Sequence, residues 1–436
     1  MRVYLKIGSR LREILAYLIA LILLLDSRTI YGFLTNTPRW WNYLIFAGIG
    51  MCVAAVLIIL LFRVIHLDKS SQQQLIFCAI IAVYFSIFVL YHDAKSYTMK
   101  LLLAFLLLAI YHIVAEKGKP DILMKFRNIV VVIAAISLLF WISGSIMHII
   151  KPSGTVLSIW SGTAAPKAVN CYKYLYFETQ EMTVPFLHIN TYRNTAVFSE
   201  APMAAFNFSI ALLTEIYINP KKRKSVIIIL SSAIITTIST TGICVLLLII
   251  IHHISKNFSK KKSPLFLILI PIILGVLALG MILVVVLVKD KVSSNSGIAR
   301  LDDFRVCFLA WLHHPLMGCG LGNGEYIQSF MSLSRLVNNK GLSNSPGLVL
   351  AEGGLYLSIL YIIAFSRMLI RSHRSKIKNY YIWALFFILI FTITMVPFVY
   401  LTFYILVWFA FGDITKENWK LSLFQKKSTE RLIDIG

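Results

Sequence analysis

Three short stretches of this sequence combine charged side chains with prolines or glycines that position a chain for chemistry. The first contains Arg193 and Glu200 and runs into Pro202. Pro202 suits the first turn of a helix, and a carboxylate beside it faces the positive end of the helix dipole. Glu200 is therefore either a helix-start carboxylate or a general base. Arg193 either binds an anion or lies among lipid headgroups.

The second stretch begins with Arg300 and Arg305 and continues through His314 and Pro315 into glycines at alternate positions. Each arginine also has a structural interpretation, because an aspartate lies three residues away on the predicted helix. His314 precedes a proline, and this disfavours helix at that position. The glycines indicate a tight turn or a phosphate cradle. Their spacing matches no P-loop, so we favour the turn.

The third stretch places Asn344 before a predicted membrane helix and Glu352 about two turns inside it. A carboxylate at that depth is costly, so we expect it to face a cavity or to pair with an arginine. Thr241 follows Thr240 at a predicted helix break. It either satisfies backbone groups at the break or contacts a ligand at the same level.

The combined residue types suit the chemistry of a sugar diphosphate. A guanidinium offers a planar fork of donors to a diphosphate, and a carboxylate can act as general base toward a sugar hydroxyl. The only adjacent acidic pair, Asp302-Asp303, does not form a credible Mg²⁺ site. We therefore predict no metal and no cofactor, and we expect arginine to stabilise the charge on a leaving diphosphate.

The composition indicates that lipid is the main solvent of the chain. Of its 436 residues, 58% are hydrophobic and 14% are charged, whereas soluble domains carry about 25% charged residues. The net charge of +23 does not indicate nucleic acid, because Lys and Arg occur in short runs between apolar segments, as in cytoplasmic loops. We predict one all-α integral membrane domain over residues 1–436.

A helix needs about 20 apolar residues to cross the hydrocarbon core. The segments that qualify are residues 40–62, 75–91, 99–115, 129–150, 201–218, 265–288 and 345–365, together with a weaker first span at 14–33 that Asp26 and Arg28 interrupt. Residues 226–254 and 381–411 are too long for one crossing and have basic residues on both sides, so each is predicted to form two helices. The total is about 12 spans, with both termini in the cytoplasm.

Two long loops, residues 151–200 and 289–344, are predicted on the extracytoplasmic face. Loops of this length are usually functional or disordered, and their aromatic content argues against disorder. We expect no disulfide between Cys171 and Cys307 or Cys319. The N-terminus is basic and then apolar without a cleavage site, and we interpret it as an uncleaved first span.

The order of these stretches resembles that of the O-antigen polymerase (Wzy-type) and O-antigen ligase family. Residues 193–202 are similar to an Arg-x-x-Gly-x-Phe-x-Glu-Pro element, with Ala196 in place of glycine and Ala201 inserted before the proline. Residues 239–242 resemble a Thr-x-Ser-Arg turn without its arginine. A later Arg…Trp…His-Pro-x-x-Gly-x-Gly element is matched by Arg300, Trp311, His314, Pro315, Gly318, Gly320 and Gly322.

The last matching element is a His-Asn pair followed by a helix with Glu-x-Gly-Leu. It is similar to Ser343-Asn344 and to residues 352–355. Ser343 stands where the family has histidine. The ligases of the family depend on that position, and its replacement favours a polymerase.

The resemblance implies a GT-C-like bundle in the bacterial cytoplasmic (inner) membrane. It implies a metal-independent, inverting glycosyltransferase that polymerises repeat units of O-antigen, capsule or exopolysaccharide. The donor would be a glycan on undecaprenyl diphosphate, and the acceptor would be a second lipid-linked repeat unit. The resemblance also implies a chain-length regulator as a protein partner. Arg193 and Arg300 are then expected to bind the diphosphate, and Arg305 is the next candidate for this contact. Glu200 or Glu352 is expected to position or deprotonate the acceptor hydroxyl. The other substrate contacts are expected from Asn344, Thr241 and His314.

Two other functions are compatible with the sequence. A ligase-type transferase would move finished glycan to lipid A core or to protein. A transporter or flippase of lipid-linked oligosaccharide should instead have charged groups within its central spans. Here the charges concentrate at the outer ends of the spans, with Asp26, Glu215 and Glu352 as exceptions.

Overall fold

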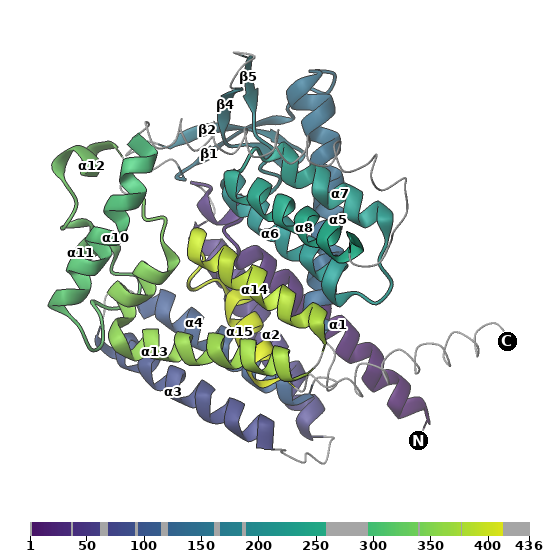
Figure 1. Cartoon of the computed structure of the whole chain (residues 1–436), viewed down its shortest axis with the longest axis vertical. Coiled ribbons are helices and arrows are strands. Elements are labelled where there is room, and N and C mark those ends of the chain that lie inside the picture. The colour runs from purple at the N-terminus through teal and green to yellow at the C-terminus, as the bar shows by residue number, and fades with distance from the viewer. Residues whose placement is uncertain are drawn as a thin grey trace, which may run out of the picture.

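The structure is a computed structural model, and it describes residues 2–35, 38–61, 69–91, 95–114, 121–160, 166–184, 189–258, 295–338, 341–375 and 377–412. Within these ranges the chain is mostly helical, with five short strands between two of the helices (Figure 1). The predicted span at 265–288 lies outside the described residues.

The first part of the chain forms five apolar helices. They are α1 (Arg2–Asp26), α2 (Pro38–Leu61), α3 (Lys69–Tyr91), α4 (Lys95–Val114) and α5 (Asp121–Phe140), which continues as the π-helical turn η2 (Trp141–Ile146). Helix α3 packs along α4, and α1 packs between α5 and α2. A short 3-10 helix, η1 (Ile30–Phe33), follows α1.

The second helical group follows the strands. It consists of α6 (Ala201–Leu213) with the π-helical turn η3 (Thr214–Ile218), α7 (Lys224–Thr236) and α8 (Thr240–Phe258). Helix α6 packs against α5, α7 and α8. The last group consists of α13 (Ser345–Arg374), α14 (Lys378–Ile393) and α15 (Tyr400–Phe411), in which α13 packs against both of the others.

Both long apolar segments divide into two helices, as predicted. Residues 226–254 form α7 and α8 around a turn at 237–239. Residues 381–411 form α14 and α15, and the break between them at 394–399 contains Pro397. The proline lacks an N–H and cannot continue a helix ladder, so a break is expected there.

The apolar helices indicate a membrane protein. Within the described ranges, four helical segments are long and apolar enough to cross a bilayer: Ser71–Val89, Asp121–Ile146, Ala201–Ile218 and Ser345–Arg374. Several shorter helices are equally apolar. On α3, Ile76, Ile80, Val83 and Ile87 form an exposed stripe at helical spacing. A stripe of this kind indicates contact with lipid. The number of 12 spans stays a prediction.

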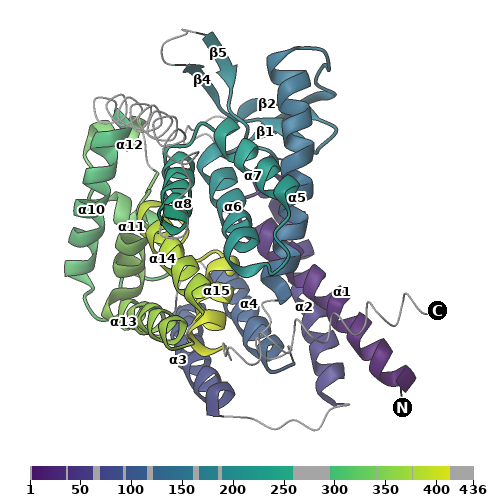
Figure 2. The same ribbon diagram turned by 45° about the vertical axis from the view of Figure 1, so that its right-hand side comes forward.

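The prediction of an all-α protein is wrong in the first long loop. Strands β1 (Gly154–Ser158), β2 (Lys167–Tyr172) and β3 (Tyr176–Glu178) form an antiparallel sheet in that order, and β4 (Glu181–Val184) pairs with β5 (Ile189–Tyr192). Val169 and Cys171 lie two residues apart on β2 and are both buried, so one face of the sheet packs on Ile30 and Leu34 of the segment after α1. Figure 2 shows the β4–β5 hairpin projecting beyond the helices.

A buried carboxylate fastens this sheet to the end of α5. Glu178 is 4% exposed, and it accepts hydrogen bonds from the Ser145 hydroxyl (2.7 Å), the Tyr172 hydroxyl (2.9 Å) and the Asn170 amide (2.7 Å). A buried carboxylate with its acceptor sites filled is held rigidly. The sheet is therefore fixed relative to the helices.

The second long loop is largely helical. It contains α10 (Asn295–His313), α11 (Gly324–Gln328) and α12 (Leu333–Asn338), and α10 packs against α13. The buried Arg335 ties this part together. Its guanidinium forms ion pairs with Asp302 (2.7 Å) and Asp303, and it also donates to the Gly341 carbonyl (3.1 Å). Sequence reasoning did not single out Arg335.

Candidate functional site

The segment after α1 runs beside the segment before α6. The Ile30 N–H donates to the Val197 carbonyl and the Ser199 N–H donates to the Arg28 carbonyl, both at 2.9 Å. Arg28 has a positive φ of 54°, which turns the chain sharply at the end of α1. The Arg28 guanidinium consequently lies 3.5 Å from the Glu200 carboxylate.

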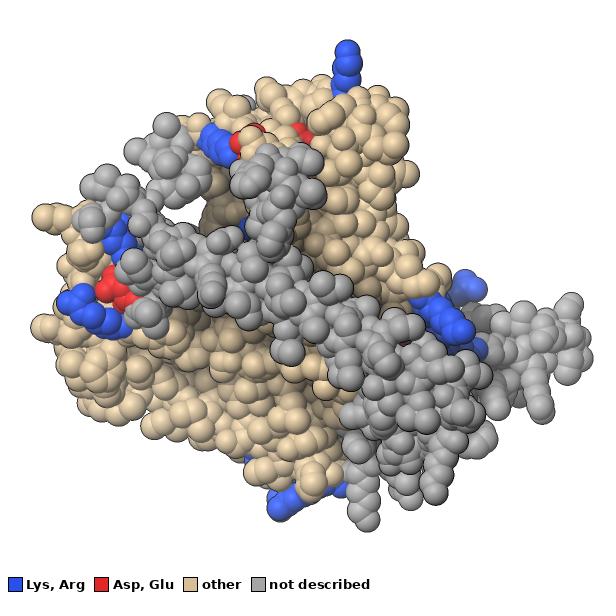
Figure 3. All heavy atoms as spheres, turned by 45° about the horizontal axis from the view of Figure 1, so that its top comes forward, with Lys and Arg blue, Asp and Glu red and all other residues tan. Residues whose placement is uncertain are grey.

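These two residues line a cavity of about 610 Å³. Figure 3 shows a hollow on the face turned forward, between the strand region and α10–α12, with basic and acidic side chains on both sides. The polar groups around the cavity come from separate parts of the chain, namely Arg28, Gln180, Glu200, Thr241, Asp303, Gln328, Ser343 and Glu352. The three stretches singled out from the sequence and the helix break that carries Thr241 therefore meet at one place.

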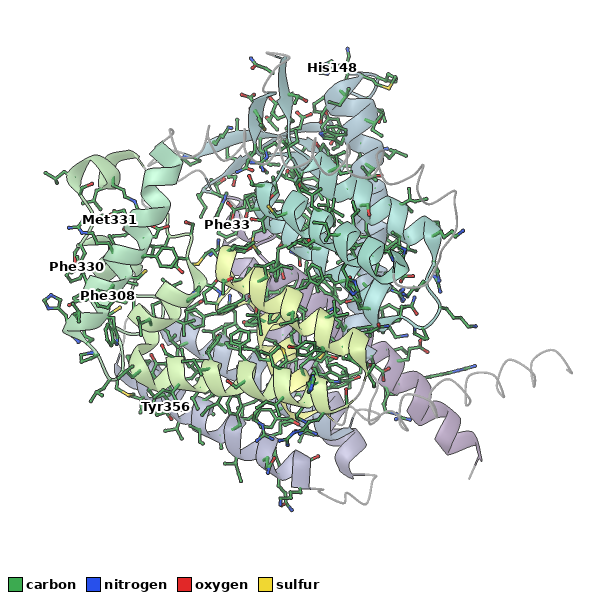
Figure 4. All side chains as sticks on the ribbon, in the orientation of Figure 1. Phe33, His148, Phe308, Phe330, Met331 and Tyr356 are labelled. Atoms are coloured by element: carbon green, nitrogen blue, oxygen red, sulfur yellow. The ribbon has the colours of Figure 1, made fainter. Side chains whose placement is uncertain are left out.

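A second compartment of about 400 Å³ adjoins the first. Both compartments are lined by Arg28, Trp160 and Glu352, so these side chains stand at their junction. The Arg28 guanidinium lies over the Trp160 ring, 5.3 Å from its centroid. Lys100 lines the smaller compartment. Phe33 also lines it and lies centrally among the helices (Figure 4).

Glu200 occupies the N-cap of α6, as its sequence context predicted, and Pro202 lies in the first turn of that helix. Its side chain makes no capping hydrogen bond to the helix. The carboxylate instead faces Arg28, and about a fifth of each side chain is exposed (22% and 23%). Glu200 is therefore a charged group of the cavity as well as the residue at which α6 begins.

Glu352 lies on α13 and faces the cavity. It is 4% exposed, and its carboxylate accepts the Gly322 N–H at 3.2 Å. Among the side chains that the structure describes, no cation lies within 4.0 Å of this carboxylate. The structure therefore favours the interpretation that Glu352 faces a cavity over its pairing with an arginine.

The alternate glycines bind to the protein itself. The Gly318 N–H donates to His314, the Gly320 N–H to the Glu352 carbonyl and the Gly322 N–H to the Glu352 carboxylate. All three glycines have positive φ, between 73° and 101°. Their N–H groups are already used, so the structure favours the tight turn over the phosphate cradle.

Arg193 stands directly behind the cavity wall. Its guanidinium donates to the carbonyls of Thr237 (2.8 Å) and Ile238 (2.9 Å) at the α7–α8 turn, and it contacts Gln180 at 3.5 Å. Desolvation lowers the pKa of Arg193 to about 10, and the nearby Glu200 charge opposes this shift. The residue stays cationic at neutral pH and braces the wall that carries Gln180 and Glu200.

Two other predicted residues lie away from the cavity. Arg305 pairs with Asp302 at 3.3 Å on the outer side of α10, and 65% of its side chain is exposed. His314 is exposed at the end of α10, where its ring contacts Tyr326. Figure 4 places Phe308 and Phe330, labelled on this same part, at the edge of the molecule.

The remaining predicted residues have mixed positions. Thr241 lines the cavity at the start of α8. Asn344 is the N-cap of α13, where its side chain accepts the Gly347 N–H at 3.0 Å, and it does not line the cavity. Arg300 lies on α10 one turn before Asp303, which does line it. The Arg300 side chain lies outside the described residues.

Comparison with known proteins adds no relative. No protein-family model matches the chain, and no curated protein matches it. The family resemblance therefore rests on the motifs quoted above.

Arg28 is the functional candidate that sequence reasoning missed. The available signal was the charged pair Asp26 and Arg28 within an otherwise apolar first span. An arginine inside an apolar segment usually faces a cavity or a partner. Here it does both, because it lines both compartments and pairs with Glu200.

Proposed function

We propose that this protein is a membrane-embedded polysaccharide polymerase that transfers a glycan from a lipid diphosphate to a lipid-linked acceptor. The observation that carries the proposal is the meeting of Arg28, Glu200 and Glu352 around one cavity between apolar helices. A guanidinium beside carboxylates suits a substrate that has both a diphosphate and hydroxyl groups. Undecaprenyl-diphosphate-linked oligosaccharide in a bacterial inner membrane fits this chemistry.

In the proposed reaction an acceptor hydroxyl oxygen attacks the anomeric carbon of the donor glycan. A new carbon–oxygen bond forms as the bond to the diphosphate oxygen breaks, and the anomeric centre inverts. Glu352 accepts the hydroxyl proton as general base. Arg28 stabilises the charge that develops on the departing lipid diphosphate.

The two carboxylates have different roles in this proposal because their surroundings differ. Glu200 faces a guanidinium 3.5 Å away, and this favours its charged form and orients Arg28. Glu352 accepts a single backbone hydrogen bond among those that the structure describes, and it lines both compartments. A general base must reach the reacting proton, and the junction position provides that reach.

Transport is a weaker alternative because the buried carboxylate at the contact of α5 with η3 is held in place by several donors. Glu215 is completely buried and pairs with Arg127. It also accepts the Asn219 amide at 2.9 Å and the Arg223 N–H at 2.6 Å. A carboxylate held by three donors acts as a structural clamp and not as a carrier site.

The proposal is tested by replacing Arg28 with Ala and with Lys in the native host. At equal membrane abundance, Arg28→Ala should abolish long-chain surface polysaccharide on a gel and leave lipid capped with single repeat units. Arg28→Lys should restore it only in part, because an ammonium lacks the planar fork.

The matched control is Lys125→Ala. Lys125 pairs with Glu13, which lies about 20 Å along α1 from Asp26 at 1.5 Å per residue. This control should keep wild-type chain lengths. Wild-type product from Arg28→Ala would overturn the proposal, and accumulation of unattached polymer would indicate a ligase instead.

A further inference from the structure

Helix α13 is interrupted directly after Glu352. Gly354 has φ 58° and ψ −160°, which no helix contains. In an unbroken helix the carbonyls of Ala351 and Glu352 would accept N–H groups four residues later. Here they accept the N–H groups of Cys319 (2.9 Å) and Gly320 (3.1 Å) from the glycine loop, residues 315–322.

The loop also accepts the N–H groups that the break releases. The Leu355 N–H donates to the Pro315 carbonyl at 2.9 Å, and the Tyr356 N–H donates to the Leu316 carbonyl at 3.0 Å. The glycine loop is thus inserted into the hydrogen-bond ladder of α13. Two bonds within the helix are replaced by four bonds between loop and helix, so the two carbonyls and two N–H groups that the break releases all have partners.

Tyr84 of α3 connects the two sides of this insertion. It is fully buried, and its hydroxyl lies 2.8 Å from the Glu352 carbonyl and 3.0 Å from the Met317 carbonyl. The first acceptor belongs to α13 and the second to the loop. The Tyr84 ring is stacked on Tyr356, with centroids 5.4 Å apart.

We propose that Tyr84 is a positioning residue that keeps the glycine loop inserted in α13 and thereby sets the direction of the Glu352 carboxylate. This rests on the proposed function, in which Glu352 is the general base. The Gly322 N–H that binds the carboxylate belongs to the same loop. Displacement of the loop therefore moves the Glu352 backbone and removes the described hydrogen bond to its side chain.

The test compares Tyr84→Phe with Tyr356→Phe. The Tyr356 hydroxyl donates to the Ile80 carbonyl at 2.8 Å, so it also joins α13 to α3 without contacting Glu352. With purified full-length protein and lipid-linked repeat units, Tyr84→Phe should lower kcat about tenfold, the order expected for a misplaced catalytic group. Its KM should stay within about twofold of wild type. Tyr356→Phe should change neither constant by more than about twofold.

A second measurement needs no enzymatic activity. A thiol at position 352, introduced as Glu352→Cys, is labelled with a small methanethiosulfonate reagent in the wild-type, Tyr84→Phe and Tyr356→Phe backgrounds. The parent proteins without this substitution provide the baseline of the native cysteines. Tyr84→Phe should change the labelling rate about fivefold or more, since a misplaced group alters rates by such factors. Tyr356→Phe should leave the labelling rate unchanged.

The two measurements separate the two ideas. Equal effects of Tyr84→Phe and Tyr356→Phe in both measurements would overturn the positioning role, even if the wild type polymerises glycan. A wild type that makes no glycosidic bond would overturn the proposed function. The labelling rates would then still decide whether Tyr84 positions residue 352.

Discussion

Arg28 and Glu200 come from segments far apart in the sequence, and they meet because the chain after α1 pairs with the chain before α6. Glu352 reaches the same cavity from a third segment. Two carboxylates in different surroundings take different roles. In the proposed reaction Glu200 orients the Arg28 guanidinium, and Glu352 receives the proton of the acceptor hydroxyl.

These roles predict unequal effects of neutralising each carboxylate. Glu352→Gln keeps the side-chain shape and an acceptor for Gly322 but loses the basic oxygen, so the transfer rate should fall about 10²- to 10⁴-fold. Glu200→Gln should cost less than about tenfold, since Arg28 is retained. Initial rates with lipid-linked repeat units measure both effects. The reverse order would assign the base to Glu200.

Arg193 and Arg305 differ in their surroundings, and the structure predicts that they contribute unequally to the stability of the fold. Arg193→Ala leaves the carbonyls of Thr237 and Ile238 without their donor, so the free energy of unfolding should fall by about 2 kcal/mol. Arg305→Ala removes an exposed ion pair and should change it by less than about 1 kcal/mol. Chemical unfolding in mixed detergent micelles measures both values. Equal losses would contradict the described positions.

At the scale of elements, the site depends on one insertion. The glycine loop enters the break in α13, and each element supplies the hydrogen-bond partners that the other lacks. Gly318 and Gly354 lie in contact at this point, and a Cβ on either would lie within 2.5 Å of backbone atoms. The two glycine motifs are therefore two halves of one junction.

This junction predicts strong intolerance at Gly318. A Cβ there would lie 2.3 Å from the Glu352 carbonyl group, in a backbone conformation with φ 73°. Gly318→Ala should lower the free energy of unfolding by about 3 kcal/mol, through overpacking and backbone strain. Gly50→Ala on α2 is the control, because its Cβ meets nothing within 4 Å and a helical alanine should stabilise by about 0.5–1 kcal/mol. Similar effects in thermal unfolding would contradict the insertion.

At the scale of the whole molecule, the cavity lies between the apolar helices and the two long loop regions. The strands and α12 lie at the end of the molecule away from the start of α1 (Figure 1). The basic Lys221–Lys224 turn between α6 and α7 is where a cytoplasmic loop is expected. This arrangement fits an extracytoplasmic opening for the site.

The orientation predicts which introduced thiols an impermeant reagent can reach. Lys151→Cys, before the first strand, should be labelled by a charged maleimide in intact spheroplasts. Lys222→Cys should be labelled only after the membrane is opened, because cationic loops stay inside. Both positions are exposed in the structure. Labelling of Lys222→Cys in intact cells would reverse the predicted topology.

The amino-acid sequence by itself determined the apolar helices and the division of the two long segments. Those features depend on composition and charge along the chain, because the hydrophobicity of each segment and the charge of its flanking loops decide whether it enters lipid or stays in water. The sequence also indicated that Glu200, Thr241 and Glu352 lie at the same depth, near the outer face of the membrane. The five strands were missed because their alternation is short and lies inside a long polar loop.

Among the arginine side chains that the structure describes, only the tertiary structure showed that Arg28 lines the cavity and that Arg305 does not. Arg28 lies at the cavity because distant backbone segments pair, and Arg305 lies away from it because it projects from the outer side of α10. The binding of the glycines to α13 likewise depends on hydrogen bonds between segments that are not neighbours in sequence. Every buried backbone group needs a hydrogen-bond partner, but the local pattern of residue types does not show which distant segment supplies it.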